Sequence, residues 1–257
     1  MQQVSRHVEW LKEKNPEKRP ENLNETIAHG DPFWLRLVSD PRLLNIAEQF
    51  VGPDIALFQS HYICKEARDG QVVLWHQDGK GWPVEPKDPM ITLWLSVTDS
   101  DDENGCVRII PRTHHDIFHE QIPGLRGDDV VFGQTIPGYA SPGEEPRAVS
   151  MVLKSGDVSV HSSRSIHGSE ANSSNRQRCG LTISYMPAGS QLVGESRPEF
   201  EGGWPCLYLL RGSATPGVND HSNGRGVGFA PWPTYIKGEH MPFKEANPPY
   251  VLGTPKL

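Results

Sequence analysis

Cysteine is rare in this chain of 257 residues, and the few that occur are not arranged in pairs. The sequence holds 4 cysteines, contains no Cys-x-x-Cys motif and spaces the cysteines widely. Small secreted folds that depend on disulfides carry closely spaced cysteines, so this pattern disfavours a disulfide framework. We therefore interpret all of them as reduced thiols that pack in the interior of an intracellular protein: Cys64, Cys106, Cys179 and Cys206.

Long apolar runs and an excess of positive charge are also missing. No segment approaches the roughly 20 apolar residues that cross a bilayer, and residues 1–7 lack the apolar core of a signal peptide. The formal net charge is -7, which argues against a broad phosphate-binding surface. We therefore predict a soluble, cytoplasmic protein with a small-molecule partner and with no nucleic-acid or membrane partner. The sequence does not indicate an oligomeric state.

Turn-forming residues, by contrast, are abundant, with 25 glycines and 23 prolines. No internal repeat is present, and the length suits one domain of an all-β kind. We predict a single domain over residues 1–257. Within it we expect a short helical part at residues 1–52, a β core at about residues 55–187 and a loop-rich part at residues 188–257.

The periodicity of apolar residues changes from helical to extended after the first fifth of the chain. Apolar residues at positions 4, 8 and 11 predict a helix over residues 4–14. A second helix begins at Asp40, an N-cap residue followed by proline, and ends at Gly52. Many short strands then indicate a mainly β sandwich or barrel. The expected strands are Ile55–Lys65, Gln71–His76, Met90–Thr98, Cys106–Ile110, Ala148–Lys154, Val158–His161, Gly180–Met186 and a final one near Cys206–Leu210.

A histidine and an aspartate one residue apart follow one of these strands. Side chains alternate along a strand, so His76 and Asp78 project to the same side and can bind one metal ion. Two histidines and one carboxylate form the facial triad of non-haem Fe(II) oxygenases, and His167 is the best candidate for the third ligand. His114 and Asp116 form a second His-x-Asp pair, in a charged segment where solvated side chains are expected.

An arginine farther along the chain supplies an anchor for a co-substrate. Arg178 lies at the entrance of the strand predicted at residues 180–186, where its planar guanidinium could hold a carboxylate through two hydrogen bonds. Such an anchor suits 2-oxoglutarate, whose 2-oxo acid end would bind the iron. Arg176 is a close rival, and the spacing from His167 favours Arg178.

Several motifs together resemble a known family over about residues 58–187. The chain is similar to the phytanoyl-CoA dioxygenase family of Fe(II)/2-oxoglutarate-dependent oxygenases, which implies a double-stranded β-helix, a jelly-roll of the cupin-like kind, with a few flanking helices. Compared with that family the chain starts late, so we expect part of the substrate lid to be reduced. The motifs are Gln59–Lys65, His76-Gln77-Asp78, Trp94, Glu103–Pro111, and His167-Gly168-Ser169 followed by Arg178.

The resemblance also implies a role for individual residues. It assigns iron binding and catalysis to His76, Asp78 and His167, and contacts with the distal carboxylate of 2-oxoglutarate to Arg178 and Ser169. For the remaining residues packing is the alternative role, because inward-facing polar and aromatic residues often only pack. Lys65 and Trp94 are expected to line the co-substrate site, and Gln59, His61 and Trp82 to contact the substrate, with His161 as a further inward-facing residue.

The implied reaction is hydroxylation of an unactivated C–H bond of a small molecule, with O2 consumed and succinate and CO2 released. The carboxylate at Asp78 argues against halogenation, because related halogenases carry a small residue there. Desaturation or ring formation by the same iron chemistry remains open. Two readings of another class also remain: a cupin-like isomerase or hydrolase that uses Zn, Mn or Ni, and a catalytically silent protein that binds a metabolite.

Overall fold

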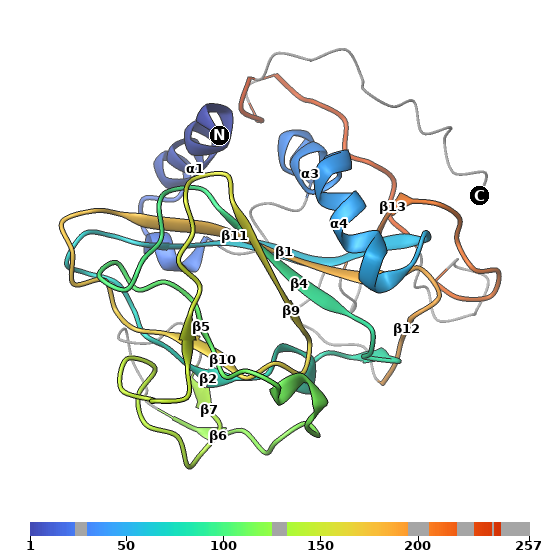
Figure 1. Cartoon of the computed structure of the whole chain (residues 1–257). Helices are drawn as coiled ribbons and strands as arrows, with labels where there is room; N and C mark the ends of the chain where they lie inside the picture. The colour runs from blue at the N-terminus through green and yellow to red at the C-terminus, as the bar shows by residue number, and fades with distance from the viewer. Residues whose placement is uncertain (24–29, 125–132, 195–205, 220–228, 238, 243–257) are drawn as a thin grey trace. The chain divides into compact units, whose positions relative to one another are not determined.

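The chain forms a mainly β structure with a few helices near its N-terminus (Figure 1). The computed structural model describes residues 1–23, 30–124, 133–194, 206–219, 229–237 and 239–242. The backbone divides into two compact units, of which the first comprises residues 1–24, 61–82 and 92–182, and the second the remainder. Three strands run through the unit boundaries: β1 (Ile55–Lys65), β4 (Ile91–Ser96) and β11 (Arg178–Pro187). The expectation of a single domain stays a prediction.

The helices begin where the sequence provides caps. Helix α1 (Gln2–Lys14) buries Val4, His7, Val8 and Leu11, which confirms the apolar face expected there. Helix α4 (Pro41–Val51) begins after Asp40, whose side chain accepts a hydrogen bond from the Arg42 amide. No part of these described helices is long and apolar enough to cross a bilayer.

Helix α3 (Pro32–Val38) was not expected from the periodicity. It has the same start signal as α4, an N-cap aspartate followed by proline. The Asp31 side chain accepts hydrogen bonds from the amides of Phe33 and Trp34 in the first turn. The aspartate-proline pair was therefore a usable signal. The helix is too short for a periodicity argument to detect.

Two sheets make up most of the first unit. One contains β1, β11, β4 and β9 (Val158–Ser162) in that order. The other has the order β2-β10-β5-β8, with β2 (Val73–His76), β10 (His167–Ser169), β5 (Arg108–Ile109) and β8 (Val149–Ser150) paired antiparallel. Figure 1 shows β2, β10 and β5 side by side. An apolar cluster of Ile63, Trp94 and Val107 packs against Ile109 of β5 and so joins residues of both sheets, as a jelly-roll requires.

Short strands complete the first unit. A hairpin of β6 (Ile122–Pro123) and β7 (Gln134–Thr135) lies next to β2. A second apolar cluster consists of Trp75 on β2, Ile136 just after β7, Ile110 and Ile166. The fold class is confirmed, and each strand expected from the sequence is present in the described residues, although most are shorter than predicted. The missed strands, such as β10, consist of two or three residues and are defined by pairing with a neighbour.

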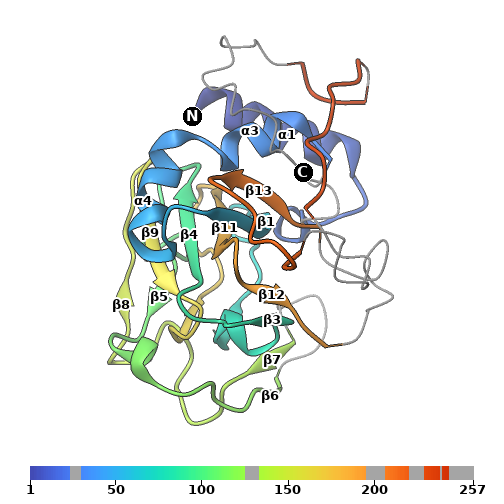
Figure 2. The same ribbon diagram turned by 90° about the vertical axis from the view of Figure 1, so that its right-hand side faces the viewer.

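The second unit contains α3, α4 and the first part of β1. Strand β13 (Tyr208–Arg211) pairs antiparallel with β1, and β12 (Gln191–Leu192) pairs with β3 (Val84–Glu85), as Figure 2 shows. The buried Trp34 indole donates to Ser60 Oγ at 3.2 Å, and the Tyr185 hydroxyl donates to the Val38 carbonyl at 2.6 Å. These bonds attach α3 to the strands of its own unit.

The expectation that all cysteines are reduced is wrong for two of them. Cys64 on β1 and Cys179 on β11 form a disulfide, with their Cα atoms 4.0 Å apart and 115 positions apart in the sequence. Spacing along the chain carries no information about which residues face each other across strands, which is why the pattern was misleading. The other two remain free, with Cys106 buried and Cys206 half-buried.

Candidate metal and co-substrate site

Two histidines face each other across the antiparallel pair of β2 and β10. His76 ends β2 and is the register partner of His167 at the start of β10, and their ring centroids are 4.1 Å apart. His76 Nδ1 lies 2.8 Å from the Leu74 carbonyl, and His167 Nδ1 lies 3.0 Å from the Ser165 carbonyl. A carbonyl only accepts, so Nδ1 carries the proton in each ring. In each ring Nε2, the atom that would bind a metal, is then on the side of Asp78.

Asp78 brings a carboxylate to the same point. It begins the short 3-10 helix η2 (Asp78–Lys80) directly after β2. Its Oδ1 lies 3.4 Å from His76 Nε2 and 3.6 Å from His167 Nε2. One potential ligand atom from each of the three residues lies within 4.8 Å of the others. An octahedral ion with ligands at about 2.1 Å holds adjacent ligand atoms about 3 Å apart, so a small contraction would close this set around an ion.

The protonation states of these residues also suit a cation. Burial acts to raise the pKa of Asp78, but His167, His161 and His76 together hold it well below its ordinary value. Burial, and then the His76 and His161 rings, lower the pKa of His167 well below its ordinary value. At neutral pH the carboxylate is therefore ionised and the His167 imidazole is neutral, which are the forms that bind a metal ion.

A pair of buried cations converges on one serine hydroxyl. Lys65 Nζ donates to Ser169 Oγ at 2.8 Å, and Arg178 Nη2 donates to the same oxygen at 3.3 Å. Lys65 and Arg178 are 0% and 1% exposed. Burial, and then Arg178, lower the pKa of Lys65 well below its ordinary value, while burial lowers the pKa of Arg178 to about 10.

These two cations have carbonyl partners but no acidic partner. Arg178 donates to the carbonyls of Gly105 and Ile63, and Lys65 also donates to the Glu170 carbonyl. Within the described ranges, neither forms an ion pair with a carboxylate. Buried charges are normally paired. The arrangement therefore fits an anionic ligand.

Trp94 covers the guanidinium of Arg178. The Arg178 Cζ lies 4.8 Å from the centroid of the Trp94 ring, which is a cation–π distance. The buried indole Nε1 has no hydrogen-bond partner among the described residues. A Cβ added at Gly180 would lie 1.9 Å from Trp94 Cζ2, so only glycine leaves room for this ring. The free indole donor is a second feature that a polar co-substrate would satisfy.

The alternative residues that the sequence left open, Arg176 and the His114/Asp116 pair, lie outside this site. Arg176 is exposed and pairs with Asp101 and Glu103 at 2.9 and 3.2 Å, which leaves Arg178 as the buried arginine of the two. In the second His-x-Asp motif, the His114 ring lies 3.9 Å from that of its neighbour His115 in a tilted arrangement. Asp116 lies 3.8 Å from His119. Neither His114 nor Asp116 belongs to the metal-ligand group of the described chain.

The residues expected on the substrate side are less well defined. His61 is half-buried on β1, and burial lowers its pKa to about 4, with Asp78 acting against this and His76 with it. Trp82 is buried and its amide donates to the Gly79 carbonyl at 3.4 Å, just after η2. Gln59 is half-buried on the part of β1 that belongs to the second unit. Their contacts with a substrate stay predictions.

Two residues beside Asp78 were not assigned to the metal site. Thr92 donates its hydroxyl to Asp78 Oδ2 at 2.6 Å. His161 Nε2 lies 3.4 Å from the same oxygen, and the His161 ring is 4.2 Å from that of His167. The sequence already placed His161 on an inward face. Only the spatial structure identifies Asp78 as their common neighbour.

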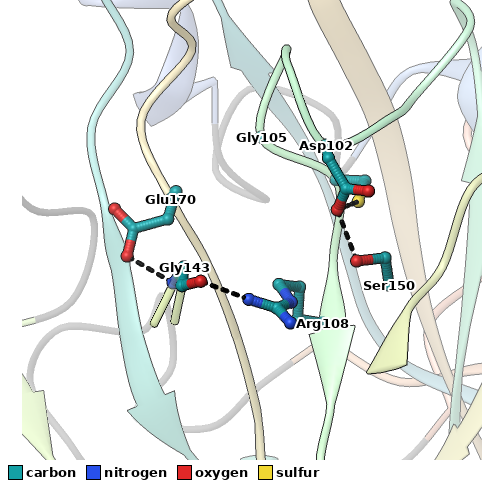
Figure 3. A pocket seen from close by; sticks show the side chains of 7 residues that line it. Asp102, Gly105, Arg108, Gly143, Ser150 and Glu170 are labelled. Atoms are coloured by element: carbon teal, nitrogen blue, oxygen red, sulfur yellow. Dashed lines mark hydrogen bonds between the residues drawn. The ribbon is translucent and has the colours of Figure 1, made fainter. Parts of the chain in front are cut away.

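A separate cavity of about 290 Å³ opens on the first unit (Figure 3). Several of its polar groups are hydrogen-bonded to one another: Glu170 Oε1 accepts from the Gly143 amide at 2.6 Å, and Arg108 donates to the Gly143 carbonyl at 2.8 Å. Ser150 donates to Asp102. None of the three clustered metal-site residues lines this cavity, whose lining is Asp102, Gly105, Cys106, Arg108, Gly143, Ser150 and Glu170.

Two solved structures with a similar fold are described as non-heme enzymes. A non-heme monooxygenase named ThoJ, in its apo form, superimposes with a TM-score of 0.67 at 20% identity and covers 83% of this chain and 76% of its own. At that identity the likeness concerns the fold alone. SnoK, a non-heme alpha ketoglutarate dependent carbocyclase from nogalamycin biosynthesis, superimposes with a TM-score of 0.54 at 25% identity and covers 72% of each chain.

Sequence comparison gives the family. A phytanoyl-CoA dioxygenase domain-containing protein 1 homolog of Caenorhabditis elegans is 26% identical over 166 residues, which cover 62% of this chain and 58% of that protein. The match thus spans little more than half of the relative's length. The sequence model of the family described as phytanoyl-CoA dioxygenase (PhyH) matches residues 5–180. Because that match extends over most of the chain, from α1 into β11, this chain belongs to the phytanoyl-CoA dioxygenase family.

Proposed function

We propose that this protein is a non-haem Fe(II)/2-oxoglutarate-dependent dioxygenase that hydroxylates an unactivated C–H bond of a small molecule. The single observation that carries the proposal is the cluster of two histidine nitrogens and one carboxylate oxygen, contributed by His76, His167 and Asp78. This donor set is the facial triad of Fe(II) oxygenases, which leaves coordination positions open for co-substrate and O2.

The co-substrate would be held by the buried cations of the same unit. Lys65 and Arg178 lack an acidic partner within the described residues and share the Ser169 hydroxyl, so one carboxylate bound beside Ser169 could accept hydrogen bonds from both cations. The free Nε1 of Trp94 offers one more donor. A dicarboxylic 2-oxo acid matches a metal site at one end and paired cations at the other.

Each part of the proposed reaction has a residue-level role in this chain. Bound iron would supply the activation of O2, with 2-oxoglutarate leaving as succinate and CO2. Asp78 and the histidines would hold the metal, and Lys65 and Arg178 would orient the co-substrate. Burial of these groups would exclude water from the oxidising centre, which limits unproductive oxidation. His61 and Trp82 are our candidates for contacts with the substrate.

Ring formation is a second candidate for the outcome of the same chemistry. It is favoured by the likeness to SnoK, which is described as a carbocyclase. Desaturation uses the same metal site. A cupin-like isomerase or hydrolase is less well supported, because such an enzyme would give no reason for two buried cations that lack an acidic partner among the described residues.

The test is anaerobic binding of Fe(II) followed by 2-oxoglutarate. We expect the weak visible charge-transfer band of the chelate to appear with the wild-type protein. Arg178→Leu should weaken the affinity for 2-oxoglutarate by at least about tenfold, because a charge-assisted pair contributes roughly 1.5–3 kcal/mol. Arg176→Leu is the matched control, since this arginine is exposed and bound to surface carboxylates, and it should change the affinity less than twofold.

Two results would contradict the proposal. A wild-type protein that binds Fe(II) but forms no band with 2-oxoglutarate cannot be an oxygenase of this kind. Equal losses in the two arginine variants would mean that Arg178 does not anchor the co-substrate. Release of succinate in the presence of O2, measured against a panel of small-molecule acids, amines and natural-product scaffolds, then identifies the substrate class.

A further inference from the structure

His161 is a buried histidine whose ring lacks ordinary hydrogen bonds. It lies on β9 with a side chain that is 3% exposed, and strand alternation turns it inward together with Ser159. Neither ring nitrogen makes a hydrogen bond of normal geometry to any residue that the structure describes. A buried polar group without a hydrogen bond lowers the stability of a protein by about 1–3 kcal/mol. A functional role would explain why a histidine occupies this position.

An oxygen of Asp78 lies close to the His161 ring. His161 Nε2 lies 3.4 Å from Oδ2, slightly beyond ordinary hydrogen-bond length. The Thr92 hydroxyl already donates to Oδ2 at 2.6 Å, and a carboxylate oxygen can accept more than one hydrogen bond. His76 and His167 instead face Oδ1. The two oxygens of one carboxylate thus have different surroundings.

We propose that His161 is a positioning residue that, together with Thr92, holds Oδ2 of Asp78 so that Oδ1 alone is presented to the metal. The inference rests on the proposed function and adds a residue to its machinery. A carboxylate can bind a metal through one oxygen or through both. Binding through both would use one of the three open positions of a facial triad. A chelating 2-oxo acid and O2 together need all three.

The geometry favours this role over direct ligation. His161 Nε2 points to the oxygen that faces away from the two histidines, and His161 is not part of the group of described residues whose ligand atoms cluster. Hydrogen bonds to a ligand residue commonly change metal affinity by 10–100-fold when they are lost. The metal-free protein is therefore the right starting material, because its metal affinity can be measured without any turnover.

The experiment is a Co(II) titration of the metal-free protein, without 2-oxoglutarate, followed by visible absorption. We expect His161→Phe to lower the Co(II) affinity by about tenfold, and His161→Gln, which keeps a donor, to recover most of it. Ser159→Ala is the matched control, because Ser159 is buried on the same strand face and has an unpartnered hydroxyl. It should bind Co(II) within twofold of wild type.

The thermal stability of the metal-free variants separates positioning from simple packing. Phenylalanine fills similar space without an unsatisfied nitrogen, so the metal-free His161→Phe protein should melt at the wild-type temperature or above it. A lower melting temperature with unchanged Co(II) affinity would overturn the proposal, and so would failure of His161→Gln to recover the affinity. Pulsed EPR of the Cu(II) protein should count two imidazoles. A count of three would make His161 a ligand and would also overturn it.

These outcomes are distinct from failure of the proposed function. A wild-type protein that binds no Co(II) would overturn the metal site itself and this inference with it. A wild-type protein that binds Co(II), and whose affinity falls only in His161→Phe, supports the role of His161 even if 2-oxoglutarate proves not to bind.

Discussion

At the scale of single residues, the side chains of the candidate metal site are arranged around the two oxygens of Asp78. Oδ1 faces His76 and His167, and Oδ2 faces Thr92 and His161. The polar neighbours of this one carboxylate thus lie on four different strands, and the three histidines among them keep it ionised. Asp78 begins the 3-10 helix η2 just after β2. At this position its short side chain lies among residues of several strands.

Removal of the Asp78 charge should abolish tight metal binding. In Asp78→Asn we expect the Fe(II) affinity to fall by more than about 100-fold, beyond what loss of a supporting hydrogen bond causes. The same substitution at Asp116, in the second His-x-Asp motif, should leave the affinity unchanged. Anaerobic equilibrium dialysis with metal analysis measures both. A larger loss in Asp116→Asn than in Asp78→Asn would relocate the metal site.

The buried thiol of Cys106 should be unreactive at physiological pH. Burial, and then the nearby Asp102, raise its pKa to about 11. The folded protein then keeps the thiol proton up to that pH, whereas the unfolded chain loses it near 9.0. Folding stability from this group is therefore present below pH 9 and is lost as the pH rises toward 11.

Labelling with iodoacetamide at pH 8 tests this difference. The thiolate is the reactive form, so Cys206, which is half-buried, should react at least about tenfold faster than Cys106. The labelling rate of Cys106 should keep rising up to about pH 11. Mass spectrometry of the digested protein gives both rates. Equal rates at pH 8 would show that Cys106 is not shielded.

At the scale of secondary-structure elements, short strands carry the chemistry because their register is fixed by neighbours. Strand β10 has three residues, His167–Ser169, and pairs with β2 on one side and β5 on the other. One of its ends supplies a metal-site histidine and the other the hydroxyl shared by two cations. Both sites are thus linked through a single short segment.

Gly180 on β11 should be essential for the placement of Trp94. In Gly180→Ala the new methyl would collide with the indole ring, and we expect a loss of about 1–3 kcal/mol in the free energy of unfolding. The affinity for 2-oxoglutarate should fall as well, since Trp94 covers Arg178. Urea unfolding and the 2-oxoglutarate titration measure the two effects.

Two further variants make that test specific. Gly81→Ala is the control, because an added Cβ there meets no atom within 4 Å, and it should change the stability by less than about 0.5 kcal/mol. Trp94→Phe introduced into Gly180→Ala should recover part of the loss, since the smaller ring leaves room for the methyl group. Purely additive effects of the two substitutions would show that they do not share this contact.

At the scale of the whole molecule, the chain brings together segments that are far apart in sequence. The strands β1 and β11 are neighbours in one sheet, and Cys64 and Cys179 join them by a disulfide that spans 115 positions. Lys65 follows Cys64 along the chain, and Arg178 precedes Cys179. The disulfide thus joins the two strands beside the two cations of the proposed co-substrate site.

The disulfide should be visible in the intact protein. When the protein is unfolded in denaturant without reductant and then alkylated, we expect two modified cysteines, and four after reduction. Peptide mapping should identify Cys106 and Cys206 as the modified pair. Four modified cysteines without reductant would contradict the link between Cys64 and Cys179.

Features set by residues close together in the sequence could be predicted, whereas contacts between distant segments could not. Alternation along one strand placed His76 and Asp78 together, and the aspartate-proline signal marked the start of α4. The same signal at Asp31 was present but unused. By contrast, the cysteine pairing depended on which strands become neighbours, and no local pattern encodes that.

The sequence by itself determined the β-rich class, the His-x-Asp pair and the residue types for a metal and an anion, because alternation, capping and charge act over a few positions. Only the tertiary structure decided that Arg178 rather than Arg176 is buried beside Ser169, and that His161 and Thr92 share an oxygen of Asp78. The physical reason is that strand register brings these side chains together, and register is set by the packing of the whole core rather than by any single segment.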